Sequence, residues 1–227
     1  MKKIIALAAG LMMMSNPSMA KDPINEDDYF TNHSMGCMLL QECTDDVQEV
    51  FSLLDVSSKY PYPDKFNFAS NEFNQMLVAL NQVGVKVYLA DQKYFPVGHR
   101  GVYHTVSNNF YLNKAHMGRP STLMSVMRHE GWHAAQDCMA GTINNSMIAI
   151  IMDEDKVPKI WQEIAADTYK FQPEAIPWEK EAFWAAKTEG MTMNALQACA
   201  RGSMWTEYEP TPLTRLWLER NGYVKEG

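Results

Sequence analysis

Residues 128–138 read Arg-His-Glu-Gly-Trp-His-Ala-Ala-Gln-Asp-Cys, inside a segment whose composition favours a helix. We predict that this helix runs from Ser121 to about Met139. His129 and His133 are four residues apart, so on a helix they lie on the same face, one turn from each other. Their ring nitrogens can therefore reach one metal ion.

Glu130 follows the first histidine and lies on the flank of the same helix face. From there its carboxylate can reach a water bound to the metal, although not the metal itself. Zinc lowers the pKa of such a water towards neutrality, and a neighbouring carboxylate can then take its proton. The pattern His-Glu-x-x-His thus predicts hydrolysis with Glu130 as the general base, whereas the simpler interpretation is a chance pair of histidines on a polar helix face.

In these residues the chain resembles the zincin metallopeptidases of the gluzincin type, and the string from Arg128 to Cys138 is similar to exported bacterial proteins of that kind. The resemblance implies a mostly helical α+β domain with a small sheet before the active-site helix. It also implies bound Zn²⁺ and a peptide or protein substrate. The metzincin branch of the family is excluded, because Gln136 and Met139 stand where its motif has glycine and histidine.

A catalytic zinc site needs three protein ligands and one open position. No histidine follows His133, so the gluzincin resemblance implies a carboxylate from a later helix. We prefer Glu181 as that ligand, because it shares a predicted apolar face with Trp178, Ala182 and Ala185. A carboxylate buried there is costly unless it is paired or bound to a metal.

Glu163 is the alternative third ligand. Glu163 and Asp167 have the spacing of the gluzincin ligand and its downstream aspartate, but both fall on a polar helix face. Glu179 ranks third. An arginine partner is the explanation of Glu181 that needs no metal.

Other residues are candidates for supporting roles. Gln136 and Asp137 follow His133 on the predicted helix and can orient its ring, because metal-bound histidines usually donate their second N–H to an acceptor. A hydrolase also needs a donor for the charge that develops on the substrate oxygen. The candidate donors are Tyr103, His104, Tyr111 and Tyr208.

The order of predicted elements is helices, a small sheet, then helices, which is typical of an α+β fold. The predicted helices other than the motif helix cover residues 44–58, 69–83, 143–154, 158–170, 177–188 and 191–201. The predicted strands cover residues 85–90, 101–106 and 109–113, the last two forming a hairpin. We expect 109–113 to be the edge strand beside the metal, where an extended peptide can add as a further strand.

The N-terminal residues have the organisation of an export signal. Met1-Lys2-Lys3 is followed by a short apolar run that ends in small residues, which predicts a signal peptide over 1–20 cleaved after Ala20. A retained anchor is the alternative. No later apolar run is long enough to span a membrane, so we expect residues 21–227 to form a single exported domain, periplasmic or secreted.

Charge and cysteine content limit the possible partners. The formal net charge of −7 argues against a nucleic-acid partner. Four cysteines in an exported chain favour two disulfides, and we favour the pairs Cys37–Cys43 and Cys138–Cys199 over four free thiols.

Three functional hypotheses remain open. The first is a zinc peptidase, the second a zinc hydrolase acting on other amides such as those of the cell wall, and the third a disulfide-stabilised binding module with an inert motif. Substrate preference separates the first two, and metal content separates both from the third. The oligomeric state is left open.

Overall fold

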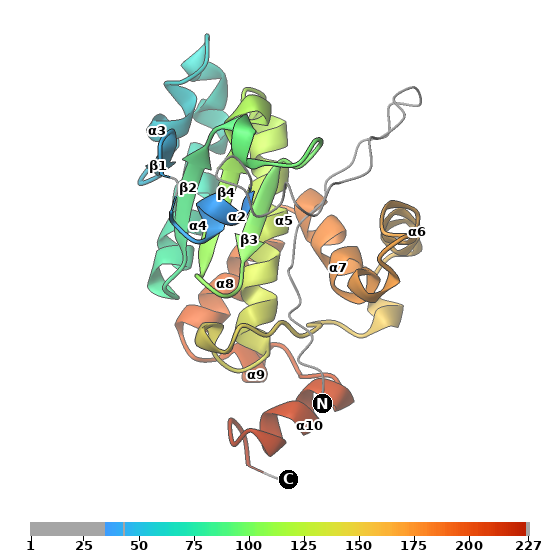
Figure 1. Ribbon diagram of the computed structural model, residues 1–227. Helices are drawn as coiled ribbons and strands as arrows, with labels where there is room; N and C mark the ends of the chain where they lie inside the picture. The colour runs from blue at the N-terminus through green and yellow to red at the C-terminus, as the bar shows by residue number, and fades with distance from the viewer. Residues whose placement is uncertain (1–34, 43, 226–227) are drawn as a thin grey trace.

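The computed structural model describes residues 35–42 and 44–225, and its centre is a four-stranded mixed sheet packed against helices (Figure 1). The strands are β1 (Val47–Glu49), β2 (Lys86–Ala90), β3 (Gly101–His104) and β4 (Asn109–Asn113), in the sheet order β1-β2-β4-β3. β2 and β4 are parallel, and the two outer pairings are antiparallel. The α+β class is therefore confirmed.

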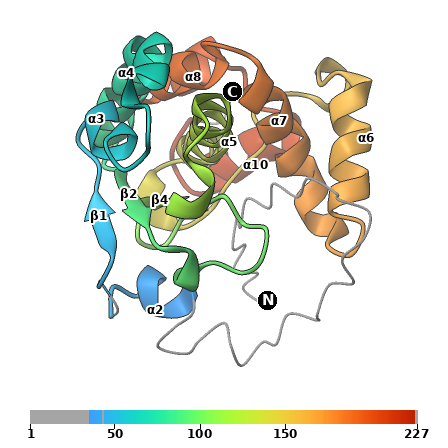
Figure 2. The same ribbon diagram turned by 90° about the horizontal axis from the view of Figure 1, so that it is seen from above.

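The sheet has two buried faces because alternate side chains point to opposite sides of a strand. On β4, Phe110 and Leu112 enter the main core, while Tyr111 and Val102 of β3 pack on the other side. That second side is covered by the short helix α2 (Met35–Leu39). Figure 2 shows the sheet lying between α2 and the larger helices.

Helix α5 (Pro120–Met139) carries the histidine motif and lies in the middle of the molecule (Figures 1 and 2). It packs against β3, against α4 (Ser70–Gln82) and against α8 (Met191–Ala200). Most of its side chains are buried, from Leu123 to the end of the helix. Because the helix is enclosed on several sides, its polar motif residues are buried as well.

A second group of helices packs against the motif helix. It consists of α6 (Lys159–Thr168) and α7 (Ile176–Lys187), and α7 contacts both α5 and α6. Ala165, Tyr169 and Phe183 form a small core between α6 and α7. Since α7 has a neighbour on two sides, it has two buried faces.

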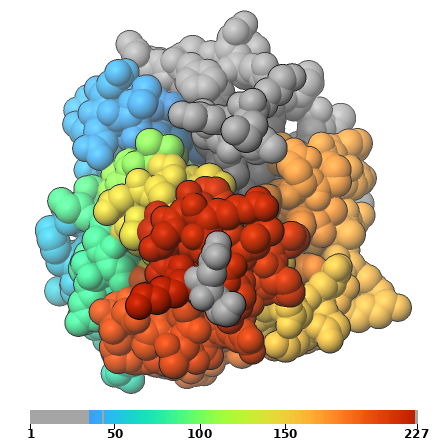
Figure 3. Space-filling view, turned by 90° about the horizontal axis from the view of Figure 1, so that it is seen from below, coloured from blue at the N-terminus to red at the C-terminus, as the bar shows by residue number. Residues whose placement is uncertain are grey.

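The C-terminal helices are α9 (Met204–Glu207) and α10 (Pro212–Arg220). Seen from below, this C-terminal segment (red) occupies the centre of its face of the molecule (Figure 3). Two indoles from the segment donate to carbonyl groups at the end of α5: Trp205 Nε1 to Met139 O at 3.2 Å and Trp217 Nε1 to Ala140 O at 2.8 Å. They satisfy backbone acceptors that a helix end leaves without an intrahelical partner.

The region predicted as a helix over 44–58 is partly a strand. Val47–Glu49 pairs with β2, and the helix α3 (Leu53–Ser57) begins only after Ser52, whose backbone N–H donates to Asp55 Oδ2 at 2.8 Å. Hydrogen bonding to β2 therefore overrides the local helical pattern of these residues. Periodicity along one segment does not reveal such a contact with a distant strand.

The prediction of a helix over 143–154 is wrong, because these residues form short turns and an extended stretch. The amide N–H groups there donate to tertiary acceptors. Ala149 N–H donates to Gln136 O at 2.9 Å, and those of Ile151 and Met152 donate to the Glu181 carboxylate. These tertiary hydrogen bonds satisfy the amide groups that intrahelical bonds would satisfy in a helix.

The other predicted helices and the hairpin are present, with ends shifted by a few residues. The prediction that 109–113 is the edge strand is wrong, because β4 pairs with both β2 and β3. The strand at the edge next to α5 is β3. The parallel pairing of β2 with β4 joins segments far apart in the chain, which the hairpin pattern alone does not show.

The disulfide Cys138–Cys199 is confirmed and links the end of α5 to α8, with the Cα atoms 5.9 Å apart. The predicted pair Cys37–Cys43 involves Cys43, which lies outside the described residues, as does the predicted signal peptide over 1–20. Within the described ranges, no helix is both long and apolar enough to cross a bilayer.

Candidate metal centre

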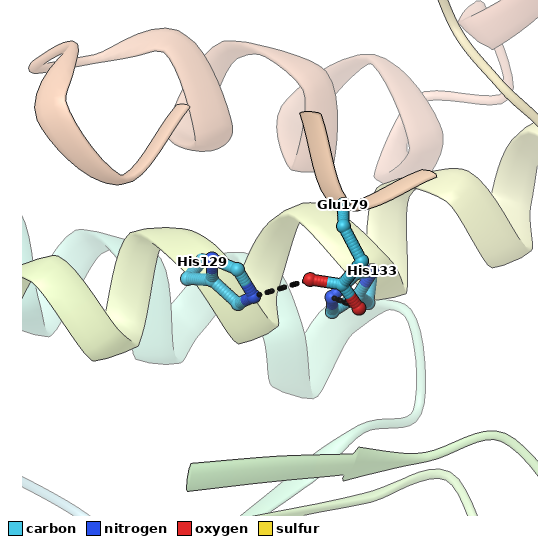
Figure 4. A group of neighbouring side chains, drawn as sticks. All are labelled: His129, His133 and Glu179. Carbon is cyan, nitrogen blue, oxygen red and sulfur yellow. Dashed lines mark ion pairs between the residues drawn. The ribbon is translucent and has the colours of Figure 1, made fainter. Parts of the chain in front are cut away.

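His129 and His133 on α5 meet the carboxylate of Glu179 on α7 (Figure 4). His129 Nε2 lies 3.2 Å from Glu179 Oε2, and His133 Nε2 lies 3.5 Å from Glu179 Oε1. One potential ligand atom from each residue lies within 4.8 Å of the others. Two imidazoles and one carboxylate form a donor set found at catalytic zinc sites.

The three side chains are buried, and their facing atoms lack hydrogen-bond partners. His129 Nε2, His133 Nε2 and Glu179 Oε2 are buried polar atoms without a partner, although the ion-pair distances are short. Their orientation is therefore not that of a hydrogen bond between imidazole and carboxylate. A buried polar atom without a partner is costly, and a cation accepting electron pairs from all three would remove that cost.

The electrostatics of the site also fit a cation. Burial lowers the pKa of His129 to about 3, against the opposing effect of the Ala182 carbonyl, and burial lowers the pKa of His133. Both rings are therefore neutral near pH 7, the form that binds metals. Burial raises the pKa of Glu179 to about 7, while His133 and the Tyr169 side chain act in the opposite direction.

Glu130 lies between the motif helix and the edge strand. Its Oε2 accepts a hydrogen bond from the backbone N–H of Tyr103 at 2.9 Å. Burial raises the pKa of Glu130 well above its ordinary value, and the charge of Glu179 raises it further. Among the described residues, no lysine or arginine forms an ion pair with either glutamate. A carboxylate held in this way favours uptake of a proton.

Gly101 allows the edge strand to lie directly on the motif helix. A Cβ atom at this position would lie 2.5 Å from Val126 Cγ1 and 3.0 Å from Glu130 Cγ. The absence of a side chain brings the backbone of β3 close enough for Tyr103 N–H to reach Glu130.

The structure does not bring Glu181, the preferred third ligand, to the histidine pair. Its carboxylate accepts hydrogen bonds from Trp132 Nε1 at 3.1 Å and Gln136 Nε2 at 2.8 Å. It also accepts from the amides of Ile151 at 3.0 Å and Met152 at 2.6 Å. Neutral N–H donors thus explain its burial, and neither a metal nor an arginine is needed. Burial raises the pKa of Glu181, and these donors oppose the shift.

The alternative ligand Glu163 does not lie at the histidine pair either. It is exposed on the surface of α6, where its carboxylate lies 3.6 Å from Lys159 Nζ. The pattern that favours Glu181 predicts a single inward face for α7, and Glu179 lies off that face. Helix α7 packs on two sides, and the face that meets the motif carries Glu179 and, four residues later, Phe183. The Phe183 ring lies 5.2 Å from the His129 ring. Glu179 and Phe183 are four residues apart, and this helical spacing is the sequence signal for the second face of α7.

The supporting residues lie in different places. His133 Nδ1 is 2.8 Å from Gln136 Oε1, so Gln136 contacts the ring that it is predicted to orient. Asp137 instead accepts a hydrogen bond from the Tyr103 hydroxyl at 2.8 Å. Tyr103 therefore directs its hydroxyl into the core between β3 and α5. Tyr111 lies on the opposite face of the sheet, where its hydroxyl contacts Met38 O at 3.4 Å.

No protein-family model, curated protein or solved structure matches the chain. The class that the fold and the site define is an α+β protein with a buried group of two histidines and one glutamate that could hold a metal ion.

Proposed function

We propose that this protein is a zinc-dependent hydrolase of the metallopeptidase type, in which His129, His133 and Glu179 hold the ion. The observation that carries the proposal is the convergence of three buried ligand atoms that have no hydrogen-bond partners. The choice of zinc follows from the donor set, since two imidazoles and a carboxylate suit a borderline-soft ion that keeps one position open. Zinc bound there would polarise a water molecule and lower its pKa.

Glu130 is the general base in this mechanism. It is the residue next to His129 on the helix, and the Tyr103 N–H holds one of its oxygens. Its carboxylate takes the proton from the attacking water and returns it to the leaving amine.

A peptide substrate is favoured by the edge strand. Asn113 N–H donates to Arg100 O at 2.9 Å, so the bonding register turns the backbone groups of Gly101 and Tyr103 away from β4. Tyr103 N–H is the group that reaches Glu130. An extended peptide adding beside β3 would therefore pass next to the general base.

Metal analysis tests the site. Purified protein should contain close to one zinc per chain, and Glu179→Gln should weaken zinc binding, because the amide has no charge and one oxygen fewer. Glu163→Gln is the matched control and should bind zinc as the unmodified protein does. Protein without zinc, with a stability that chelators leave unchanged, would contradict the proposal and favour a binding module.

Activity tests the chemistry. Digests of a peptide mixture and of peptidoglycan should show cleavage of peptides, and Glu130→Gln should keep its zinc while losing roughly 10²–10⁴-fold in rate. An unchanged rate would remove Glu130 from the mechanism. Cleavage of peptidoglycan alone would replace the peptidase proposal with that of a cell-wall amide hydrolase.

A further inference from the structure

The Glu181 carboxylate is surrounded by donors. Oε1 accepts from the amides of Ile151 and Met152, and Oε2 accepts from Trp132 Nε1, from Gln136 Nε2 and also from the Ile151 amide, which lies between the two oxygens. Each of these contacts brings an N–H group to an oxygen. The carboxylate can therefore act only as an acceptor here.

This arrangement determines which way the Gln136 amide faces. Its Nε2 donates to Glu181 Oε2 at 2.8 Å and to Trp178 O at 3.1 Å. Both partners are oxygens that accept, so the NH₂ group must face them. The amide oxygen of Gln136 is then left facing His133.

The orientation of Gln136 in turn determines the tautomer of His133. Gln136 Oε1 lies 2.8 Å from His133 Nδ1 and can only accept, so Nδ1 carries the proton of the neutral ring. Nε2 is then unprotonated, and its electron pair faces Glu179. Only this tautomer can bind a metal through Nε2.

We propose that Glu181 is a positioning residue that acts through Gln136 to hold His133 in the tautomer whose Nε2 can bind the metal. The role in metal binding rests on the proposed function, but the tautomer is a property of the protein without metal. The same carboxylate anchors the extended segment at Ile151 and Met152, so one side chain joins α7, α5 and this segment.

The variant Glu181→Gln has a defined consequence. The Met152 N–H makes the shortest bond to the Glu181 carboxylate, 2.6 Å to Oε1, so the oxygen of the new glutamine stays there and its NH₂ group replaces Oε2 and faces Gln136. Gln136 then turns its amide oxygen towards this NH₂ group, gives up its 3.1 Å bond to Trp178 O, and presents its own NH₂ group to His133 Nδ1. The proton of the ring then moves to Nε2, where it blocks the metal.

Two measurements follow. In ¹⁵N NMR spectra of the metal-free protein, with the signal assigned by His133→Gln, the ring should be protonated at Nδ1 in the unmodified chain and at Nε2 in Glu181→Gln. In a competition assay with a zinc chelator, Glu181→Gln should bind zinc about 10–100-fold more weakly, the usual effect of removing such a partner. Glu163→Gln is the matched control and should change neither result.

The exchange variant Glu181→Gln/Gln136→Glu separates positioning from a general structural role. It places the carboxylate beside His133 and an amide donor behind it, so it should restore the Nδ1 proton and most of the zinc affinity. The inference would be overturned if the exchange variant bound zinc no better than Glu181→Gln. It would also be overturned if the His133 ring of Glu181→Gln stayed protonated at Nδ1. If the unmodified protein binds no zinc, the proposed function fails, while the NMR comparison still decides the tautomer.

Discussion

Glu179 and Glu181 are separated by one residue on α7 and are both buried, but their partners differ in kind. Glu181 has N–H donors around both oxygens, whereas Glu179 faces two imidazole nitrogens that have no hydrogen-bond partners. Burial is costly for both carboxylates unless they are paired. Protein donors meet this requirement for Glu181, and for Glu179 we propose that a bound cation meets it.

Asp137 makes the stability of the protein depend on pH. Burial raises its pKa to about 8, although the Tyr103 hydroxyl lowers it, so the folded protein keeps a proton that the unfolded chain releases above about 3.8. This group therefore contributes a fall in the free energy of unfolding as the pH rises from about 4 to 8. Asp137→Asn should make the difference between urea unfolding at pH 5 and at pH 8 smaller. An equal difference in both proteins would contradict the assignment.

At the scale of elements, the site depends on the contact between β3 and α5. Tyr103 joins them twice, through its backbone N–H to Glu130 and through its hydroxyl to Asp137. Gly101 allows the approach, since any side chain there meets Val126. The hairpin is therefore a part of the candidate site and not only of the core.

Gly101→Ala tests this contact. The added methyl group overlaps Val126 Cγ1, so it should lower the free energy of unfolding by about 1–3 kcal/mol. Val126→Ala removes the obstructing methyl groups, so the double variant should lose less than the sum of the two single changes in a urea denaturation cycle. Additive losses would show that the two groups do not compete for the same space.

At the scale of the whole molecule, Cys138–Cys199 closes a chain loop that contains α6 and α7. The two cysteines are 61 residues apart in the sequence, and the disulfide fixes the end of α5 to α8. Glu179 lies within this loop while its two histidine partners lie just before it. This loop supplies Glu179, the third candidate ligand. The disulfide thus holds both ends of the loop close to the motif helix.

Removing this disulfide should destabilise the protein without removing its candidate metal ligands. The chain-entropy relation gives about 4 kcal/mol for a loop of 61 residues. Cys138→Ser/Cys199→Ser should therefore show a lower Tm and a lower free energy of unfolding, and still bind zinc at low temperature. A Tm equal to that of the oxidised protein would show that the helix packing alone holds the loop.

The sequence by itself determines the features of this protein that depend on a single helix or hairpin. Most of the helices, the hairpin and the geometry of His129, Glu130 and His133 depend on spacing along one element, where a difference of four residues fixes which side chains share a face. The Cys138–Cys199 pair also followed from cysteine content and the helices it joins.

The tertiary structure alone decided the third candidate ligand, the edge strand and the extended segment before α6. Each depends on how separate elements pack: α7 between two helices, β4 between two strands, and the amides of Ile151 and Met152 on Glu181. A periodic pattern shows that a face is buried but not which partner buries it. Glu179 therefore occupies the position beside the two histidines that was predicted for Glu181, because the face of α7 that meets the motif helix is the one that carries Glu179.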